Sequence, residues 1–239
     1  MSTINILHLY PNEMNLYGDH GNILALKRRL EWRGYDANVI TYEPGDTFPD
    51  NIDIIFGGGG QDSGQSKIEQ DLINIGPEIK ALIDSGTPAL LVCGLYQLFG
   101  EYFQTAEGKR INGIAVLNAH TVAGSERLIG NIVIHSERFG EITGYENHSG
   151  LTHIGDNCEP FGKVLKGAGN NGTDGTEGII YQNCIGTYLH GPVLPKNPAV
   201  ADFLISKAIE RKTNAPVVLQ ELNDEIELNA HKVAASRPR

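Results

Sequence analysis

A cysteine, Cys93, ends an apolar run and is followed at once by a glycine. The run at residues 89–92 has the composition of a buried strand, and the apolar spacing after Gly94 favours a short helix. A strand, a sharp turn and a helix form the arrangement that lifts a nucleophile out of the fold, here with sulfur in place of a serine oxygen. Backbone N–H groups and the helix dipole at such a turn favour a thiolate. The same segment would also suit a packed core thiol.

A histidine, His190, ends a second apolar run at residues 185–189, and a glycine follows again. Parallel strands bring their C-terminal ends to one edge of an α/β sheet, so Cys93 and His190 can meet there. A cysteine and a histidine within hydrogen-bond reach are the minimum for thiolate chemistry, whereas a lone histidine is more often structural. The position of His190 at a strand end favours the catalytic interpretation. We therefore predict that these two side chains share a proton.

Three further segments could complete a site. Four glycines at residues 57–60 suit a permissive turn, or a backbone that presents N–H groups to a developing oxyanion. They match neither a phosphate loop nor a dinucleotide fingerprint. Arg127 could be a solvated surface charge, or could hold a carboxylate by two parallel hydrogen bonds. The polar residues 145–150 suit a site and a surface loop equally well.

The elements that must position these residues alternate along the first half of the chain. We expect strands at residues 4–10, 37–42, 52–56 and 89–92, and helices at 22–32 and 68–85. This order predicts an α/β fold with a mostly parallel central sheet that has helices on both faces. Glycine-broken segments then predict short antiparallel strands at 129–134, 141–145, 162–166, 178–182 and 184–189, with hairpin turn residues at 170–175. Helices over 199–211 and 219–235 close the chain.

The composition excludes several classes of protein. The net charge of −10 disfavours a partner that is a nucleic acid or an anionic membrane. No apolar run is long enough to span a membrane, and the N-terminus lacks the features of a signal peptide. Three cysteines without paired spacing indicate reduced thiols and a cytoplasmic location, with Cys158 and Cys184 as bystanders. No cluster has metal-ligand spacing, so we expect no metal.

The motifs together resemble a known family. Gly-Gly-Gly-Gln-Asp at residues 58–62, Cys-Gly-Leu-Tyr-Gln at 93–97 and Tyr-Leu-His-Gly-Pro at 188–192 resemble the class I glutamine amidotransferases of the cobyric acid synthase branch. The more specific segments 9–22 and 145–150 resemble the GatD-type glutaminase subunits of lipid II isoglutaminyl synthases. The resemblance implies a flavodoxin-like amidotransferase domain over residues 4–211, followed by a C-terminal helical extension over 212–239.

The resemblance also implies a chemistry. Cys93 would attack the side-chain amide of glutamine, His190 would transfer protons, and water would resolve a γ-glutamyl thioester after ammonia leaves. Gly59 or a neighbouring glycine and the N–H of Gly94 would form the oxyanion hole. Glutamine itself would be bound at its α-carboxylate by Arg127, with help from Gln97, Asn147 and His148.

A partner is implied as well. The resemblance implies a heterodimer with a Mur-ligase-like subunit (MurT) that uses ATP and Mg to amidate D-glutamate of the lipid II stem peptide to D-isoglutamine. No cofactor is expected in this chain. The alternatives are the glutaminase component of a cobyric or cobyrinic acid synthase, a related thiol amidase, and a binding module without catalysis.

One position departs from the broader class. Many members carry a glutamate two residues after the histidine, where this chain has Pro192. Either the Cys–His pair works without an orienting acid, or the acid comes from elsewhere in the chain or from the partner. The sequence leaves this third catalytic role open.

Overall fold

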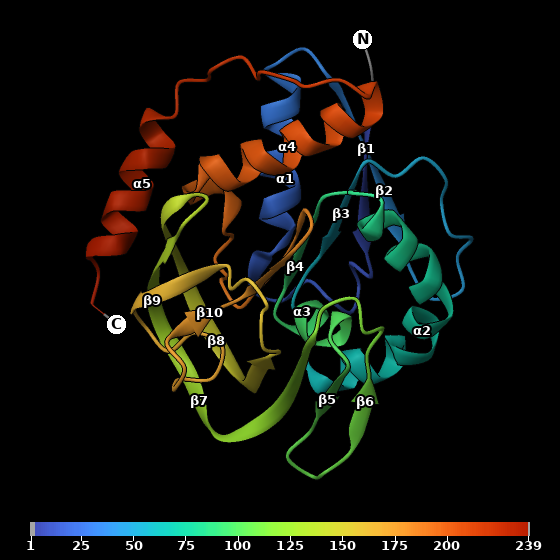
Figure 1. Cartoon of the computed structure of the whole chain (residues 1–239), viewed down its shortest axis with the longest axis vertical. Coiled ribbons are helices and arrows are strands. Elements are labelled where there is room, and N and C mark those ends of the chain that lie inside the picture. Colours follow the sequence, from blue (N-terminus) through green and yellow to red (C-terminus); the bar gives the residue numbers. More distant parts are fainter. Residues whose placement is uncertain (1–2, 239) are drawn as a thin grey trace.

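The computed structural model describes residues 3–238 and contains two six-stranded sheets (Figure 1). The first sheet has the strand order β11-β12-β4-β3-β1-β2, and all its pairs are parallel except β11 with β12. Its strands are β1 (Thr3–Leu9), β2 (Asp36–Tyr42), β3 (Ile54–Gly57), β4 (Ala89–Val92), β11 (Ile179–Tyr181) and β12 (Cys184–Thr187). The predicted α/β fold with a mostly parallel central sheet is confirmed.

Four helices accompany this sheet: α1 (His20–Glu31), α2 (Asp62–Asp84), α3 (Gly94–Phe99) and α4 (Pro198–Thr213). The β1-to-β2 and β3-to-β4 connections run toward opposite edges, so right-handed crossovers place α1 and α2 on opposite faces. α1 buries Ile23, Leu26 and Leu30, which share one helical face. β3 and β4 are buried throughout, as strands covered on both faces must be.

The second sheet is built on one long antiparallel ribbon, β7 (Ala119–Ser136) with β8 (Gly140–Ile154). β5 (Tyr102–Gln104), β6 (Arg110–Asn112), β9 (Gly162–Lys166) and β10 (Thr176–Glu177) complete it. The prediction of short, glycine-broken strands is wrong for this ribbon. A Cβ on Gly144 would stand 2.7 Å from Leu189, and one on Gly150 would overlap Gln97. These glycines lie inside β8, where it closely approaches α3 and the segment after β12.

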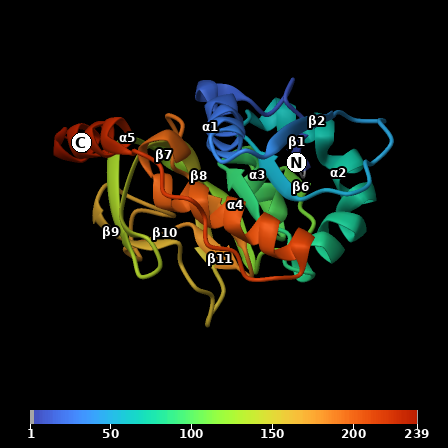
Figure 2. The same ribbon diagram turned by 90° about the horizontal axis from the view of Figure 1, so that it is seen from above.

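The C-terminal segment lies beside the second sheet. α5 (Glu225–Ser236) contacts β7, β8 and the 3₁₀ turn η2 (Leu194–Lys196), and it lies at the opposite end of the molecule from α2 (Figure 2). It begins later than predicted, after Asp224, whose carboxylate pairs with the buried Arg29 of α1. Arg239, the last residue of the predicted extension, lies outside the described residues. The division at residues 211 and 212 stays a prediction.

Within residues 3–238, no helix has the length and apolar character needed to cross a bilayer.

Candidate active site

The ends of β4 and β12 bring the predicted pair together. These strands are parallel neighbours with Val92 opposite Thr187, so Cys93 and the segment leading to His190 leave the sheet at the same edge. The Cys93 N–H donates to the carbonyl of Thr187 at 2.8 Å. The His190 backbone forms an isolated bridge with Tyr145 of β8, with N···O distances of 2.8 and 3.1 Å. A Cβ on Gly59 would lie 2.9 Å from Cε1 of His190 and 3.2 Å from Cβ of Cys93, so the two side chains are close neighbours. The structure thus places the two residues together.

Cys93 occupies a strained turn between β4 and α3. Its φ of 51° and ψ of −102° are unusual for a residue with a side chain, and such strain is found preferentially at functional sites. The bond to Thr187 holds its amide, and its carbonyl accepts the N–H of Gln97 at 3.0 Å. Only 8% of the residue is exposed. This is the predicted strand–turn–helix arrangement with a sulfur at the turn.

The acid that orients His190 is Asp19, in the turn that leads into α1. Its Oδ1 lies 3.1 Å from Nδ1 of His190, and both residues are buried. Burial lowers the pKa of His190, but hydrogen bonds to Asp19 and Cys93 and the charges of both outweigh it and raise this pKa to about 10. His190 is therefore an imidazolium at neutral pH. Asp19 is not among the residues predicted from the sequence, although it lies within the family-specific segment 9–22.

The glycine loop at residues 57–60 both binds Asp19 and lines the cavity. The Gly59 N–H donates to Oδ2 of Asp19 at 2.8 Å, so this N–H is committed to the carboxylate that contacts His190. Gly59 is therefore not the donor to assign to an oxyanion. Its neighbour Gly60 lines the cavity beside Cys93, and the Gly60 nitrogen lies 2.8 Å from the position of a Cβ on Gly94. The backbones of Gly60 and Gly94 therefore approach each other beside the sulfur.

Gly59→Ala tests how tightly this loop packs. The new Cβ would lie 2.9 Å from Cε1 of His190 and 3.2 Å from both Cβ of Cys93 and Oδ2 of Asp19. The imidazole must then shift, and a displaced catalytic group costs rate, so we expect kcat for glutamine hydrolysis to fall at least about tenfold. Initial rates of ammonia release give kcat.

Gly76→Ala is the matched control for this variant. The added Cβ would meet Ile114 at the same 2.9 Å, but in the middle of α2 and away from the cavity. It should keep its activity, because the neighbour there is a flexible apolar side chain. Equal losses in the two variants would show that the Gly59 effect is only a packing defect.

A cavity of about 100 Å³ opens beside Cys93. It unites Cys93 with the four residues predicted to bind substrate, which come from distant parts of the chain. The lining consists of Leu16, Gly60, Gln61, Asp62, Cys93, Gln97, Phe103, Arg127, Asn147, His148, Ser149 and Gly150. Gln61 and Asp62 are wall residues that the sequence analysis did not select. Their position directly after the glycine loop was the available signal.

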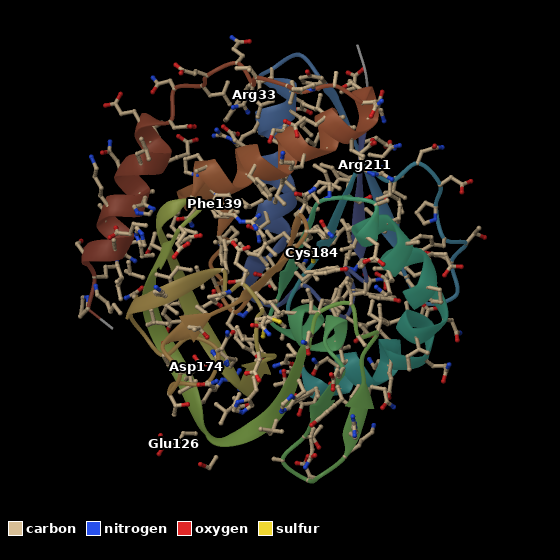
Figure 3. The ribbon with its side chains drawn as sticks, in the orientation of Figure 1. Arg33, Glu126, Phe139, Asp174, Cys184 and Arg211 are labelled. Carbon is tan, nitrogen blue, oxygen red and sulfur yellow. The ribbon has the colours of Figure 1, made fainter. Side chains whose placement is uncertain are left out.

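Arg127 sits at the irregularity in β7, where the register with β8 shifts between Ala123 and Leu128. Its neighbour Glu126 lies on the outer arm of the ribbon, away from the core (Figure 3). The Arg127 Nε–H donates to Oδ1 of Asn147 at 2.6 Å. Asn147 therefore fixes the plane of the guanidinium at the cavity wall.

Asn147→Ala is expected to raise the KM for glutamine roughly tenfold with little change in kcat, because a hydrogen bond to a charged group contributes on the order of 1–2 kcal/mol. Steady-state kinetics separate the two parameters. Asn131→Ala is the control, since Asn131 is on the same ribbon but binds the carbonyl of Pro238 instead. A fall in kcat at constant KM would count against the orienting role of Asn147.

The other two predicted substrate residues form the cavity wall. The His148 ring stacks on Tyr188 at 3.6 Å, and its Nδ1 lies 2.7 Å from the carbonyl oxygen of Gly150. Burial, with the nearby charges of His190 and Arg127, lowers the pKa of His148 to about 4, so the ring is neutral. The Gln97 amide accepts from Gln65 at 2.7 Å and donates to the Tyr188 hydroxyl at 3.0 Å. Both ends of this amide are therefore held by the protein.

The remaining cysteines lie outside the cavity lining. Cys184 is fully buried in β12 at the centre of the molecule, and burial raises the pKa of its thiol (Figure 3). Cys158 is half-buried, with its Sγ 3.6 Å from the carbonyl oxygen of Asn118. Both positions suit structural thiols.

Comparison with known proteins gives the family. Residues 5–198 match the CobB/CobQ-like glutamine amidotransferase domain. The chain is 41% identical to the lipid II isoglutaminyl synthase (glutamine-hydrolyzing) subunit GatD of Staphylococcus aureus, over 99% of this chain and 97% of that protein. It is 42% identical to the subunit of the same name from Streptococcus pneumoniae, over 92% and 86%.

A crystal structure of a glutamine amidotransferase shares the fold, with a TM-score of 0.59 at 14% identity over 84% of this chain and 98% of that one. The chain therefore belongs to the CobB/CobQ-like glutamine amidotransferases and, within them, to the family of the GatD subunits of glutamine-hydrolysing lipid II isoglutaminyl synthases.

Proposed function

We propose that this chain hydrolyses glutamine through a Cys93 thioester. The observation that carries the proposal is the buried Cys93–His190–Asp19 arrangement beside the cavity. The Cys93 thiolate attacks the side-chain amide carbon, and the His190 imidazolium gives its proton to the leaving nitrogen, which departs as ammonia. Neutral His190 then takes a proton from the water that attacks the thioester. Glutamate leaves, and the thiolate and imidazolium are restored.

The cavity wall supplies the other roles. The N–H groups of Gly60 and Gly94 would stabilise the oxyanion of each tetrahedral intermediate. Arg127, held by Asn147, would bind the α-carboxylate of glutamine. Asp62, on the same wall, has the charge to bind the α-ammonium. The arrangement thus offers opposite charges to the two ends of an amino acid whose side chain points at Cys93.

The ammonia would be used by a partner subunit. The GatD relatives are named as subunits of lipid II isoglutaminyl synthase, and the close similarity over nearly the whole chain supports the same assembly here. The proposed partner is a MurT-like Mur ligase in a cytoplasmic heterodimer. It would bind ATP and Mg, activate the α-carboxylate of D-glutamate in lipid II, and form D-isoglutamine with the delivered ammonia.

Reconstitution tests both halves of the proposal. The chain alone should release equal amounts of glutamate and ammonia from glutamine. With the partner, ATP, Mg and lipid II, glutamine should support amidation that mass spectrometry detects on the stem peptide. Amidation of a corrinoid instead of lipid II would overturn the acceptor while leaving the glutaminase intact. Peptide cleavage without glutamine hydrolysis would indicate a thiol amidase.

A further inference from the structure

A carboxyl group outside the cavity is tied to the backbone that carries the catalytic pair. Glu177, in β10, is fully buried, and its Oε1 accepts the N–H of Tyr188 at 2.7 Å. The Thr187 hydroxyl lies 3.1 Å from each of the two Glu177 oxygens. Glu177 is absent from the cavity lining, and its hydrogen bonds to Tyr188 and Thr187 link it to the site.

Thr187 is the junction between the two catalytic residues. Its carbonyl accepts the Cys93 N–H, which holds the strained turn of the nucleophile. Its hydroxyl also accepts the N–H of Leu189 at 3.0 Å, which shapes the last bend before His190. Thr187 therefore connects the carboxyl of Glu177 both to the backbone amide of Cys93 and to the bend that precedes His190.

We propose that Glu177 is a positioning residue that sets the placement of Cys93 relative to His190 by fixing Thr187. The inference rests on the proposed thioester mechanism and names a group that supports it without touching substrate. A Cys–His pair works only when sulfur and imidazole stay within hydrogen-bond reach, so a shift of the 187–190 segment lowers the rate of the chemical step. Substrate affinity should not change, because the segment that Glu177 fixes follows β12 of the first sheet, whereas Arg127 and Asn147 belong to β7 and β8 of the second.

The environment of Glu177 indicates which substitutions are conservative. Burial raises the pKa of its carboxyl to about 8, with the nearby buried Glu146 acting in the same direction and His190 in the opposite one. The group is thus largely protonated at neutral pH, and a glutamine side chain reproduces its shape, its lack of charge and its hydrogen bonds. Glu177→Gln and Thr187→Ser should therefore act like the natural residues.

The test compares Glu177→Ala and Thr187→Val with these conservative variants. We expect each disruptive change to lower kcat at least about tenfold at unchanged KM, while Glu177→Gln and Thr187→Ser stay within about twofold. The double variant Glu177→Ala/Thr187→Val should be no slower than the slower single variant, because both changes break the same link. Alkylation of Cys93 by iodoacetamide should slow in parallel. If Glu177→Ala does not fold, the isosteric Thr187→Val and its serine control decide the matter.

Three results would contradict the role proposed for Glu177. Losses that multiply in the double variant, a rise in KM in place of a fall in kcat, or a Glu177→Gln variant as slow as Glu177→Ala would overturn the proposal. A natural chain that releases no ammonia would instead count against the thioester mechanism. The alkylation rates of Cys93 would still report the Glu177 link in that case.

Discussion

Cys93→Ala is expected to abolish glutamine hydrolysis, with kcat reduced by at least about 10⁴-fold, because no other group can form the thioester. The residue lies beside the cavity and next to His190, and alanine removes the sulfur without filling new space. The measurement is ammonia release, with thermal unfolding to show that the variant folds. In the assembled complex, added ammonium should still support amidation, because the partner's chemistry is untouched.

Cys158→Ala is the matched control for Cys93→Ala. Cys158 is half-buried and lies outside the cavity lining. Its replacement should leave kcat within about twofold of the natural value, as is usual for substitutions away from a functional site. Cys184 is less suitable, because replacing a fully buried thiol disturbs packing. Substantial glutaminase activity in Cys93→Ala would refute the proposed nucleophile.

Asp19→Asn is expected to lower kcat about 100-fold, since the orienting acid of a nucleophile–histidine pair sets both the direction and the charge of the imidazole. The asparagine keeps the shape but removes the charge that opposes burial. The pKa of His190 should therefore fall from about 10, and the imidazolium should be lost at a lower pH. The pH dependence of Cys93 alkylation measures this shift directly, and its alkaline limb should move to lower pH.

The same substitution has a defined effect on stability. The pKa of His190 is raised in the folded state above its ordinary value of 6.5, so its protonation stabilises the fold fully below that pH. This contribution disappears as the pH rises through about 10. Asp19→Asn should thus lower the unfolding temperature at pH 6 and have a smaller effect at pH 10. Asp36→Asn, at an exposed position, is the control. An unchanged alkaline limb would contradict the role given to Asp19.

The sequence was sufficient to predict that Cys93 and His190 lie together, because each of them has a local signature. Cys93 and His190 both follow short apolar strands and precede glycines, and the geometry of parallel sheets brings such positions to one edge. Asp19 has no comparable signature. It lies 171 residues from His190 in a loop without periodicity, and only the packing of that loop against the glycines at 57–60 brings the two together.

The ribbon of β7 and β8 was harder to predict for a different reason. Glycine weakens a strand in general, so the glycines of this segment favoured several short strands, one of them ending at residue 145. The role of Gly144 and Gly150 depends on what faces them, namely Leu189, just after β12, and Gln97 of α3. A single sequence gives the residue type at such a position but not its neighbour, and the neighbour decides between a strand end and a close approach.

Because of the bridge between Tyr145 and His190, β8 sets the distance between His190 and the other residues that this strand presents to the cavity. Two residues beyond that bridge, the same strand presents Asn147, which holds Arg127. Two residues along one strand thus separate the position that binds the His190 backbone from the position that holds Arg127. Strand side chains alternate between faces, so inserting or deleting a single residue there would turn one of the two functions away from the cavity.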